Sequence, residues 1–192
     1  MSRSRHITAP PGRVRIIGGC LRGSRLAVPT LPGLRPTPDR LRETLFNWLM
    51  PVIDGARALD LFAGSGALGI EALSRGAALA LLVERGHAQA AAIESDLARL
   101  HVDGGEVHCG DALTMLAREP PRPFDIVFLD PPFDAGLWAP VAQALEAGRW
   151  LAPGALVYIE SPQGAAFALP PAWTPHRLTR VGAVSGALYR RA

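Results

Sequence analysis

The chain contains no lysine, so all 20 of its basic side chains are arginines. Only two of its 192 residues are cysteines, Cys20 and Cys109, and their spacing matches no metal-binding motif. We expect reduced, buried thiols rather than a disulfide. No apolar run approaches the ~18 residues of a membrane-spanning helix, and residues 1–12 lack the apolar segment of a signal peptide. These absences predict a cytoplasmic globular protein.

Charge is distributed unevenly along the chain. Residues 1–50 hold nine arginines but only two acidic residues, Asp39 and Glu43, which gives a net charge of +7. Residues 51–192 hold eleven arginines and fifteen acidic residues, which gives −4. A basic end on an acidic body indicates that a polyanion binds at that end, although a solvated basic tail would give the same pattern.

Turn residues and short apolar runs organise the N-terminal part. We expect residues 1–12 to be disordered. Apolar segments on both sides of glycine turn signals predict a β-hairpin, and the hairpin and a linker form an extension over residues 13–33. Four arginines lie on this hairpin: Arg13, Arg15, Arg22 and Arg25. Residues 34–192 form the main domain, in which Thr37 is the predicted N-cap of a helix that ends at Pro51.

Strand-like and helix-like segments alternate from residue 57 onward. Strands are predicted at 57–62, 79–84, 105–109, 124–129 and 155–160, and helices at 67–76, 87–101, 111–118 and 136–147. This alternation predicts an α/β fold, with a mostly parallel sheet and helices on both faces. Residues 176–181 and 187–190 flank two glycines and predict a terminal antiparallel pair that closes the sheet.

A glycine-rich turn follows the first predicted strand. The segment from Gly64 to Gly69 matches the G-x-G-x-x-G pattern of dinucleotide sites, so a nicotinamide or flavin cofactor is one candidate. Asp60 precedes this turn, however, at a position where its carboxylate would repel a pyrophosphate. A carboxylate there favours a cationic ligand without phosphate. S-adenosylmethionine fits this description, because it carries an ammonium and a sulfonium group.

Two further acidic residues follow the next strands. Glu84 ends the second strand, and its two oxygens can accept hydrogen bonds from both ribose hydroxyls. Asp111 follows the third strand and can accept from an adenine amine, although an N-cap is an equally typical role for it. Glu84 could also be a solvated strand end. The predicted cofactor site comprises Asp60, Phe62, Ala63, Gly64, Ser65, Gly66, Glu84, Asp111 and Ala112.

The fourth strand ends in the strongest chemical signal, Asp130-Pro131-Pro132-Phe133. Prolines remove backbone donors and leave carbonyl acceptors, so the Asp130 carboxylate and the Pro131 carbonyl form a rigid pair of acceptors. Such a pair can hold both hydrogens of an exocyclic amine while Phe133 stacks on the nucleobase. Orienting the amine toward a methyl sulfonium then requires positioning rather than a metal. We therefore predict that these four residues form the catalytic site.

These motifs resemble those of a known family. The stretch Asp60–Gly66 resembles motif I of class I S-adenosylmethionine-dependent methyltransferases, and Asp130–Phe133 resembles motif IV of their amino-methylating branch. Residues 15–19 and 33–49 closely resemble the bacterial 16S rRNA guanine-N2 methyltransferases that modify guanine 966. Many relatives in the wider branch have tyrosine where Phe133 stands, a difference that preserves stacking.

The resemblance implies a Rossmann-like, seven-stranded methyltransferase fold and a specific reaction. A methyl group would pass from S-adenosylmethionine to the N2 amine of a guanine in 16S ribosomal RNA. Apart from the resemblance, we expect the RNA to be presented within an assembling small subunit and the enzyme to be a monomer. The basic extension would contact the RNA through Arg13, Arg15, Arg22 and Arg25, and Arg35 just after it would add a fifth contact. Two alternatives stay open: an adenine-N6 nucleic-acid methyltransferase, because those enzymes share the Asp-Pro-Pro-aromatic motif, and a non-catalytic RNA-binding assembly factor.

Overall fold

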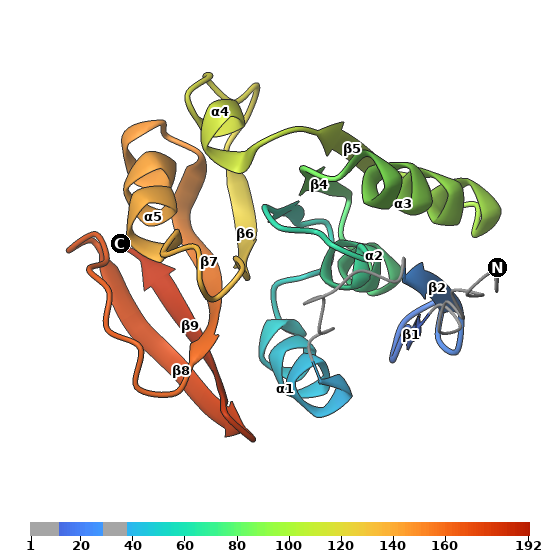
Figure 1. The fold of residues 1–192 in the computed structure, drawn as a ribbon, viewed down its shortest axis with the longest axis horizontal. Coiled ribbons are helices and arrows are strands. Elements are labelled where there is room, and N and C mark those ends of the chain that lie inside the picture. The colour runs from blue at the N-terminus through green and yellow to red at the C-terminus, as the bar shows by residue number, and fades with distance from the viewer. Residues whose placement is uncertain (1–11, 29–37) are drawn as a thin grey trace, which may run out of the picture.

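A computed structural model describes residues 12–28 and 38–192, and its elements follow the predicted alternation (Figure 1). The chain begins with two short strands, β1 (Gly12–Arg15) and β2 (Arg25–Val28), and continues through α1 (Asp39–Leu49), β3 (Arg57–Asp60), α2 (Ala67–Ser74), β4 (Leu79–Glu84), α3 (His87–Arg99), β5 (Gly105–Cys109), α4 (Ala112–Leu116), β6 (Phe124–Leu129), α5 (Trp138–Ala147), β7 (Leu151–Pro162), β8 (Trp173–Val181) and β9 (Val184–Arg191). Disorder was predicted for residues 1–12, of which residues 1–11 lie outside the described residues and Gly12 begins β1. The linker after the hairpin also lies outside the described residues.

The central sheet has seven strands in the order β5-β4-β3-β6-β7-β9-β8. The first five strands of this order run parallel, and β9 pairs antiparallel with both β7 and β8. The predicted mostly parallel sheet and its terminal antiparallel pair are therefore confirmed. Successive strands are added in opposite directions on either side of β3 and β6, and such a switch point is where open α/β sheets bind ligands.

Helices cover both faces of the sheet and create two separate cores. On one face, α1, α2 and α3 bury a core that contains Leu45, Phe46 and Phe128. On the other face, α4 and α5 bury a second core that contains Val127 and Leu145. Strand β6 contributes to both cores on alternate residues, which explains why its sequence is almost entirely apolar.

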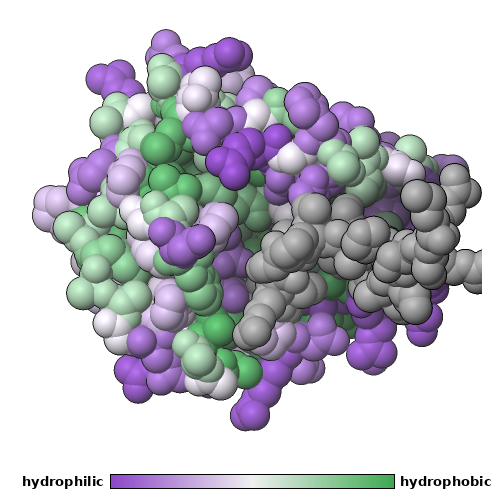
Figure 2. Space-filling view, in the orientation of Figure 1, coloured by the Kyte–Doolittle hydropathy of each residue, from purple (hydrophilic) through white to green (hydrophobic). Residues whose placement is uncertain are grey.

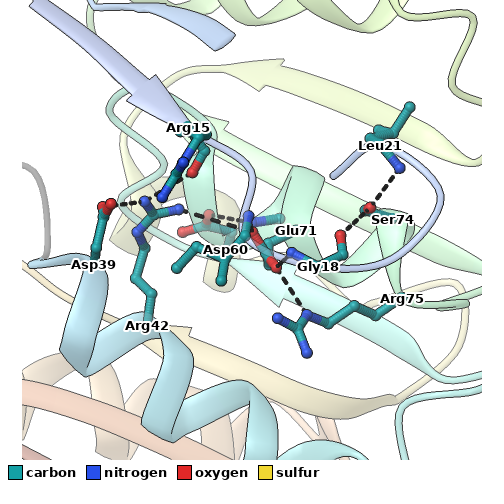
Figure 3. A network of polar contacts seen from close by, with 11 residues as sticks. Arg15, Gly18, Leu21, Asp39, Arg42, Asp60, Glu71, Ser74 and Arg75 are labelled. Atoms are coloured by element: carbon teal, nitrogen blue, oxygen red, sulfur yellow. Dashed lines mark hydrogen bonds and ion pairs between the residues drawn. The ribbon is translucent and has the colours of Figure 1, made fainter. Parts of the chain in front are cut away.

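The N-terminal hairpin forms a two-stranded sheet of its own that packs on the outer side of α2 and α3 (Figure 1). Val14 and Leu26 face each other across this hairpin and point into the core. The turn of the hairpin is fixed by buried polar groups of α2: Glu71 accepts hydrogen bonds from the backbone N–H groups of Ile17 (2.7 Å) and Gly18 (2.8 Å), as Figure 3 shows for Gly18. Every residue of α2 is consequently buried, whereas the sequence indicated only one apolar face.

Three expectations about local structure differ from the observed elements. Helix α1 begins at Asp39 with Pro38 as its N-cap, and the predicted N-cap Thr37 lies outside the described residues. Strand β7 begins four residues earlier than predicted, because a register shift against β6 accommodates Pro153 and Gly154 within the strand. Both cysteines are free, as expected, but they are exposed rather than buried.

The described helices are all too short or too polar to span a bilayer. Hydrophilic side chains dominate the face shown in Figure 2, and hydrophobic ones gather on the half that holds α5 and β7.

Candidate active site

The predicted site residues of the main domain converge at the carboxyl edge of the sheet, where β3 and β6 end side by side. Asp60 is the last residue of β3 and pairs with Phe128, and Asp130 follows two residues after Phe128. Asp60 and Asp130 are thereby brought to the same switch point. A surface groove of about 300 Å³ lies at the opposite edge, lined by Asp54, Asp125 and Arg190 among others, away from these strand ends.

Asp60 is buried, with only 2% of its surface exposed. Burial raises the pKa of its carboxyl from 3.8 to about 7, opposed by the hydrogen bond from the Gly69 backbone N–H (3.0 Å) and reinforced by the nearby negative charge of Glu84. A carboxylate so poorly solvated is stabilised by any cation that approaches it. This environment suits an ammonium group and disfavours a pyrophosphate.

The glycine turn brings its backbone close to the ligand position. Gly64 and Gly66 have positive φ values of 55° and 74°, a conformation that side chains strongly disfavour. A Cβ atom at Gly66 would also lie 3.1 Å from Ile70 and 3.2 Å from Ile93. Only glycine therefore allows the chain to pass from β3 into α2 along this path.

Glu84 and Asp111 lie at the ends of the next strands, and both already serve the protein. Glu84 accepts hydrogen bonds from the backbone N–H groups of Gly64 (2.9 Å) and Gly86 (2.7 Å). It therefore ties the glycine turn to the end of β4. Asp111 is the N-cap of α4 and accepts from the Thr114 backbone N–H (2.9 Å), which confirms the alternative role considered for it. Carboxylate oxygens accept more than one hydrogen bond, so these contacts leave room for a ligand.

The tetrapeptide after β6 leaves the sheet in a tight turn. Asp130 is half-buried and Pro131 is buried, whereas the Phe133 ring is 41% exposed. The Pro132 carbonyl accepts from the Ala135 N–H (3.0 Å) and closes the turn. Within the described ranges, the Pro131 carbonyl receives no hydrogen bond. Asp130 and Pro131 therefore stand directly after β6 and beside an accessible aromatic residue, and their role as a pair of acceptors stays a prediction.

Two aromatic residues behind Phe133 were not anticipated from the sequence. The ring of Trp138 lies 6.0 Å from that of Phe133 and stacks on Phe167 at 5.3 Å. The Trp138 indole N–H donates to the backbone carbonyl of Glu160 (2.8 Å), so its ring is fixed in orientation. A large aromatic residue soon after Asp-Pro-Pro-Phe was the available signal for this support.

The predicted RNA-binding arginines of the hairpin are all exposed. Arg13 lies opposite Ala27 and Arg15 lies opposite Arg25, so three arginines share the face that points away from the core. Like charges placed opposite each other repel, and an anion bound over this face would relieve that repulsion. Arg22 lies in the turn, and Arg35 falls outside the described residues.

Comparison with known proteins places the chain among methyltransferases. The protein named "Ribosomal RNA small subunit methyltransferase D" of Escherichia coli (strain K12) is 49% identical over 181 residues, which cover 94% of this chain and 91% of that protein. The protein of the same name from Haemophilus influenzae is 42% identical over a stretch that covers 93% of this chain and 94% of that protein. The solved structure of the putative methyltransferase yhhF from Escherichia coli superposes with a TM-score of 0.87 at 46% identity. The match covers 94% of this chain and 98% of that one.

The sheet order, the glycine turn and these likenesses define a class I S-adenosylmethionine-dependent methyltransferase. A family model described as "Conserved hypothetical protein 95" matches residues 14–190, and the chain belongs to this family. The interpretation of the glycine pattern as a nicotinamide or flavin site is therefore wrong. The pattern alone cannot distinguish the two cofactors, whereas the carboxylate before it can.

Proposed function

We propose that the chain transfers the methyl group of S-adenosylmethionine to the N2 amine of one guanine in 16S ribosomal RNA, guanine 966 by its resemblance to the family. The observation that carries this proposal is the position of Asp130, Pro131 and Phe133 at the switch point, beside the glycine turn that follows Asp60. The names of the relatives support a small-subunit RNA as the substrate.

The acidic strand ends and the glycine turn match the chemistry of the cofactor. Asp60 would stabilise its cationic methionine end, Glu84 would accept from the ribose hydroxyls, and Asp111 would accept from the adenine amine. The backbone of Phe62, Ala63, Gly64, Ser65 and Gly66 would line the methionine end, and Ala112 would lie beside the adenine. When bound, S-adenosylmethionine supplies an electrophilic methyl group on a positively charged sulfur.

Asp130 and the Pro131 carbonyl would each accept one hydrogen of the guanine amine, so that its nitrogen lone pair points at the methyl carbon. The nitrogen–carbon bond would form as the carbon–sulfur bond breaks, and the electron pair of the broken bond would stay on sulfur. The positively charged amine then loses one proton, which the adjacent Asp130 carboxylate can accept and pass to water. Phe133 would hold the base plane by stacking, after the base has left its own stack.

We further propose that the hairpin arginines bind RNA phosphates and that the enzyme acts in the cytoplasm as a monomer. Arg13, Arg15, Arg22 and Arg25 are exposed, and guanidinium groups pair with phosphates in two-pronged geometry. Arg35 is proposed on the sequence alone. The substrate would be RNA folded within an assembling small subunit, because loops and unpaired bases are the readable parts of RNA.

The test is methylation of undermethylated small ribosomal subunits with a cofactor labelled at its methyl group, followed by digestion of the RNA. We expect the label in N2-methylguanine at one position. Asp130→Ala should abolish transfer but leave cofactor binding nearly unchanged, because Asp130 holds the acceptor rather than the donor. Label on adenine would support the N6 alternative, and binding of RNA without any transfer would support the assembly factor.

A further inference from the structure

A fifth carboxylate lies at the carboxyl edge of the sheet, and the reaction above does not use it. Glu160 is near the end of β7, the strand next to β6, and only 4% of its surface is exposed. Ile159 of β7 pairs with Leu129 of β6, and Glu160 and Asp130 are the next residues along these two neighbouring strands. Parallel strands in register place such residues on the same face, so the two residues stand side by side at the carboxyl edge of the sheet.

The surroundings of Glu160 fix it from two sides. The Tyr158 hydroxyl donates to its carboxylate Oε2 at 3.2 Å, while its backbone carbonyl holds the indole of Trp138. Burial raises the pKa of Tyr158, and the charges of Glu160 and Asp130 raise it further, so the hydroxyl stays protonated and remains a donor. The register of β6 and β7 places Asp130 beside Glu160, which is the carboxylate partner of Tyr158.

A carboxylate beside the amine-binding pair can distinguish one base from another. In guanine the N2 amine is flanked by N1–H, which is a hydrogen-bond donor. In adenine and in 2-aminopurine the ring nitrogen N1 is bare and carries a lone pair. An ionised carboxylate only accepts hydrogen bonds, so it attracts N1–H and repels a bare N1. Flipped bases are commonly recognised through this edge.

We propose that Glu160 selects guanine by accepting a hydrogen bond from its N1–H while Asp130 and Pro131 hold the N2 amine. This assignment rests on the proposed function, since it specifies how the same site chooses its base. Tyr158 orients the Glu160 carboxylate. The Trp138 indole links the position of Glu160 to that of the stacking ring of Phe133.

The experiment compares guanine with 2-aminopurine, which keeps the 2-amine but lacks the N1 hydrogen. Small subunits are reconstituted with 16S RNA that carries either base at the target position, and kcat/KM is measured for each. The wild-type enzyme should prefer guanine by at least roughly 100-fold, because a site that hydrogen-bonds a donor rejects analogues without it. In Glu160→Gln the amide can donate to a bare N1, so the preference should fall at least roughly tenfold.

The ratio of the two substrates does not depend on how much of each preparation is folded. It also cancels the intrinsic difference between the two amines when variants are compared. Glu146→Gln is the matched control, since Glu146 pairs with Arg191 and Trp173 at the opposite edge, and its ratio should equal that of the wild type. If Glu160→Gln slows both substrates equally, or the wild type accepts both equally, Glu160 does not select the base. N2-methylguanine would still form in that case, whereas label on adenine or no transfer overturns the proposed function itself.

Discussion

At the scale of single residues, the buried Asp60 is a source of instability that a bound cation would relieve. Its pKa lies at about 7 in the folded chain, above the ordinary 3.8. Because the folded state holds this proton more tightly, the stability associated with Asp60 is fully present below pH 3.8 and is lost as pH rises toward 7. Between pH 5 and pH 8 the expected loss is roughly 2–3 kcal/mol.

Asp60→Asn should therefore stabilise the ligand-free protein at pH 8 and weaken cofactor binding. An asparagine keeps an acceptor for the Gly69 N–H but carries no charge to desolvate or to attract an ammonium group. Urea unfolding of both proteins at pH 5 and pH 8, with calorimetric titration of S-adenosylmethionine, measures the two effects. A stability difference that does not change with pH would show that Asp60 ionises normally.

The ring of Phe133 carries the second prediction at this scale. Stacking of a base on an aromatic ring contributes about 1–3 kcal/mol, so Phe133→Ala should lower kcat/KM for RNA roughly 5- to 150-fold. Phe133→Tyr should remain close to the wild type, because stacking is preserved. Cofactor affinity should be unchanged in both variants. An equal loss for alanine and tyrosine would mean that the ring packs against the protein rather than the base.

A site residue could be predicted from the sequence when its neighbours along the chain mark it, and could not when its role depends on contacts between distant segments. Four acidic residues were recognisable because each stands at the end of a predicted strand or within two residues after it, and parallel strands end at one edge: Asp60, Glu84, Asp111 and Asp130. Glu160 has the same pattern after Leu156–Ile159, but no adjacent motif such as the glycine turn or the proline pair marks it as a site residue. The bonds from Glu84 to Gly64 and Gly86 could not be predicted, because they depend on how two loops meet in space.

At the scale of elements, the hairpin is held to the main domain by a buried ionic cluster on α2. Glu71 is fully buried and accepts from Ile17, Gly18 and the Arg75 guanidinium, while the fully buried Arg42 of α1 lies 3.8 Å from it (Figure 3). Helical periodicity did not predict the burial of Glu71 or Arg42, because it places charged residues on the outer, solvent-exposed face of a helix. The hairpin covers that face, and such coverage is a tertiary property.

Glu71→Gln should cost about 3–5 kcal/mol of unfolding free energy, as breaking a buried ion pair does. The amide would turn a donor toward a backbone N–H and leave two arginines without their shared anion. Glu94→Gln makes the same change at an exposed position of α3 and should stay within about 0.5 kcal/mol of the wild type. Urea unfolding measures both. A cost below about 1 kcal/mol would show that water replaces Glu71 at the hairpin.

At the scale of the whole molecule, the proposed active site and the proposed RNA-binding surface lie on different parts: the carboxyl edge of the central sheet and the separate N-terminal hairpin. The alternation of elements predicted the parallel direction of the strands, whereas their order in the sheet became known only from the structure. The place of the hairpin was not predicted, because its strands pair only with each other. The four exposed hairpin arginines, Arg13, Arg15, Arg22 and Arg25, thereby lie on a layer beside α2 and α3 rather than on the central sheet.

If that surface binds RNA phosphates, affinity should depend on salt in proportion to the arginines involved. When the logarithm of the binding constant is plotted against the logarithm of the salt concentration, each phosphate contact to single-stranded RNA contributes about −0.7 to the slope. Changing Arg13, Arg15 and Arg25 together to glutamine should make the slope shallower by about 2. Arg122→Gln, at an exposed position before β6, should leave the slope unchanged, because it lies at the edge opposite the active site. Filter binding across a salt series, with a target-loop RNA, distinguishes these outcomes. An unchanged slope in the triple variant would mean that the hairpin carries a solvated charge and that the RNA docks elsewhere.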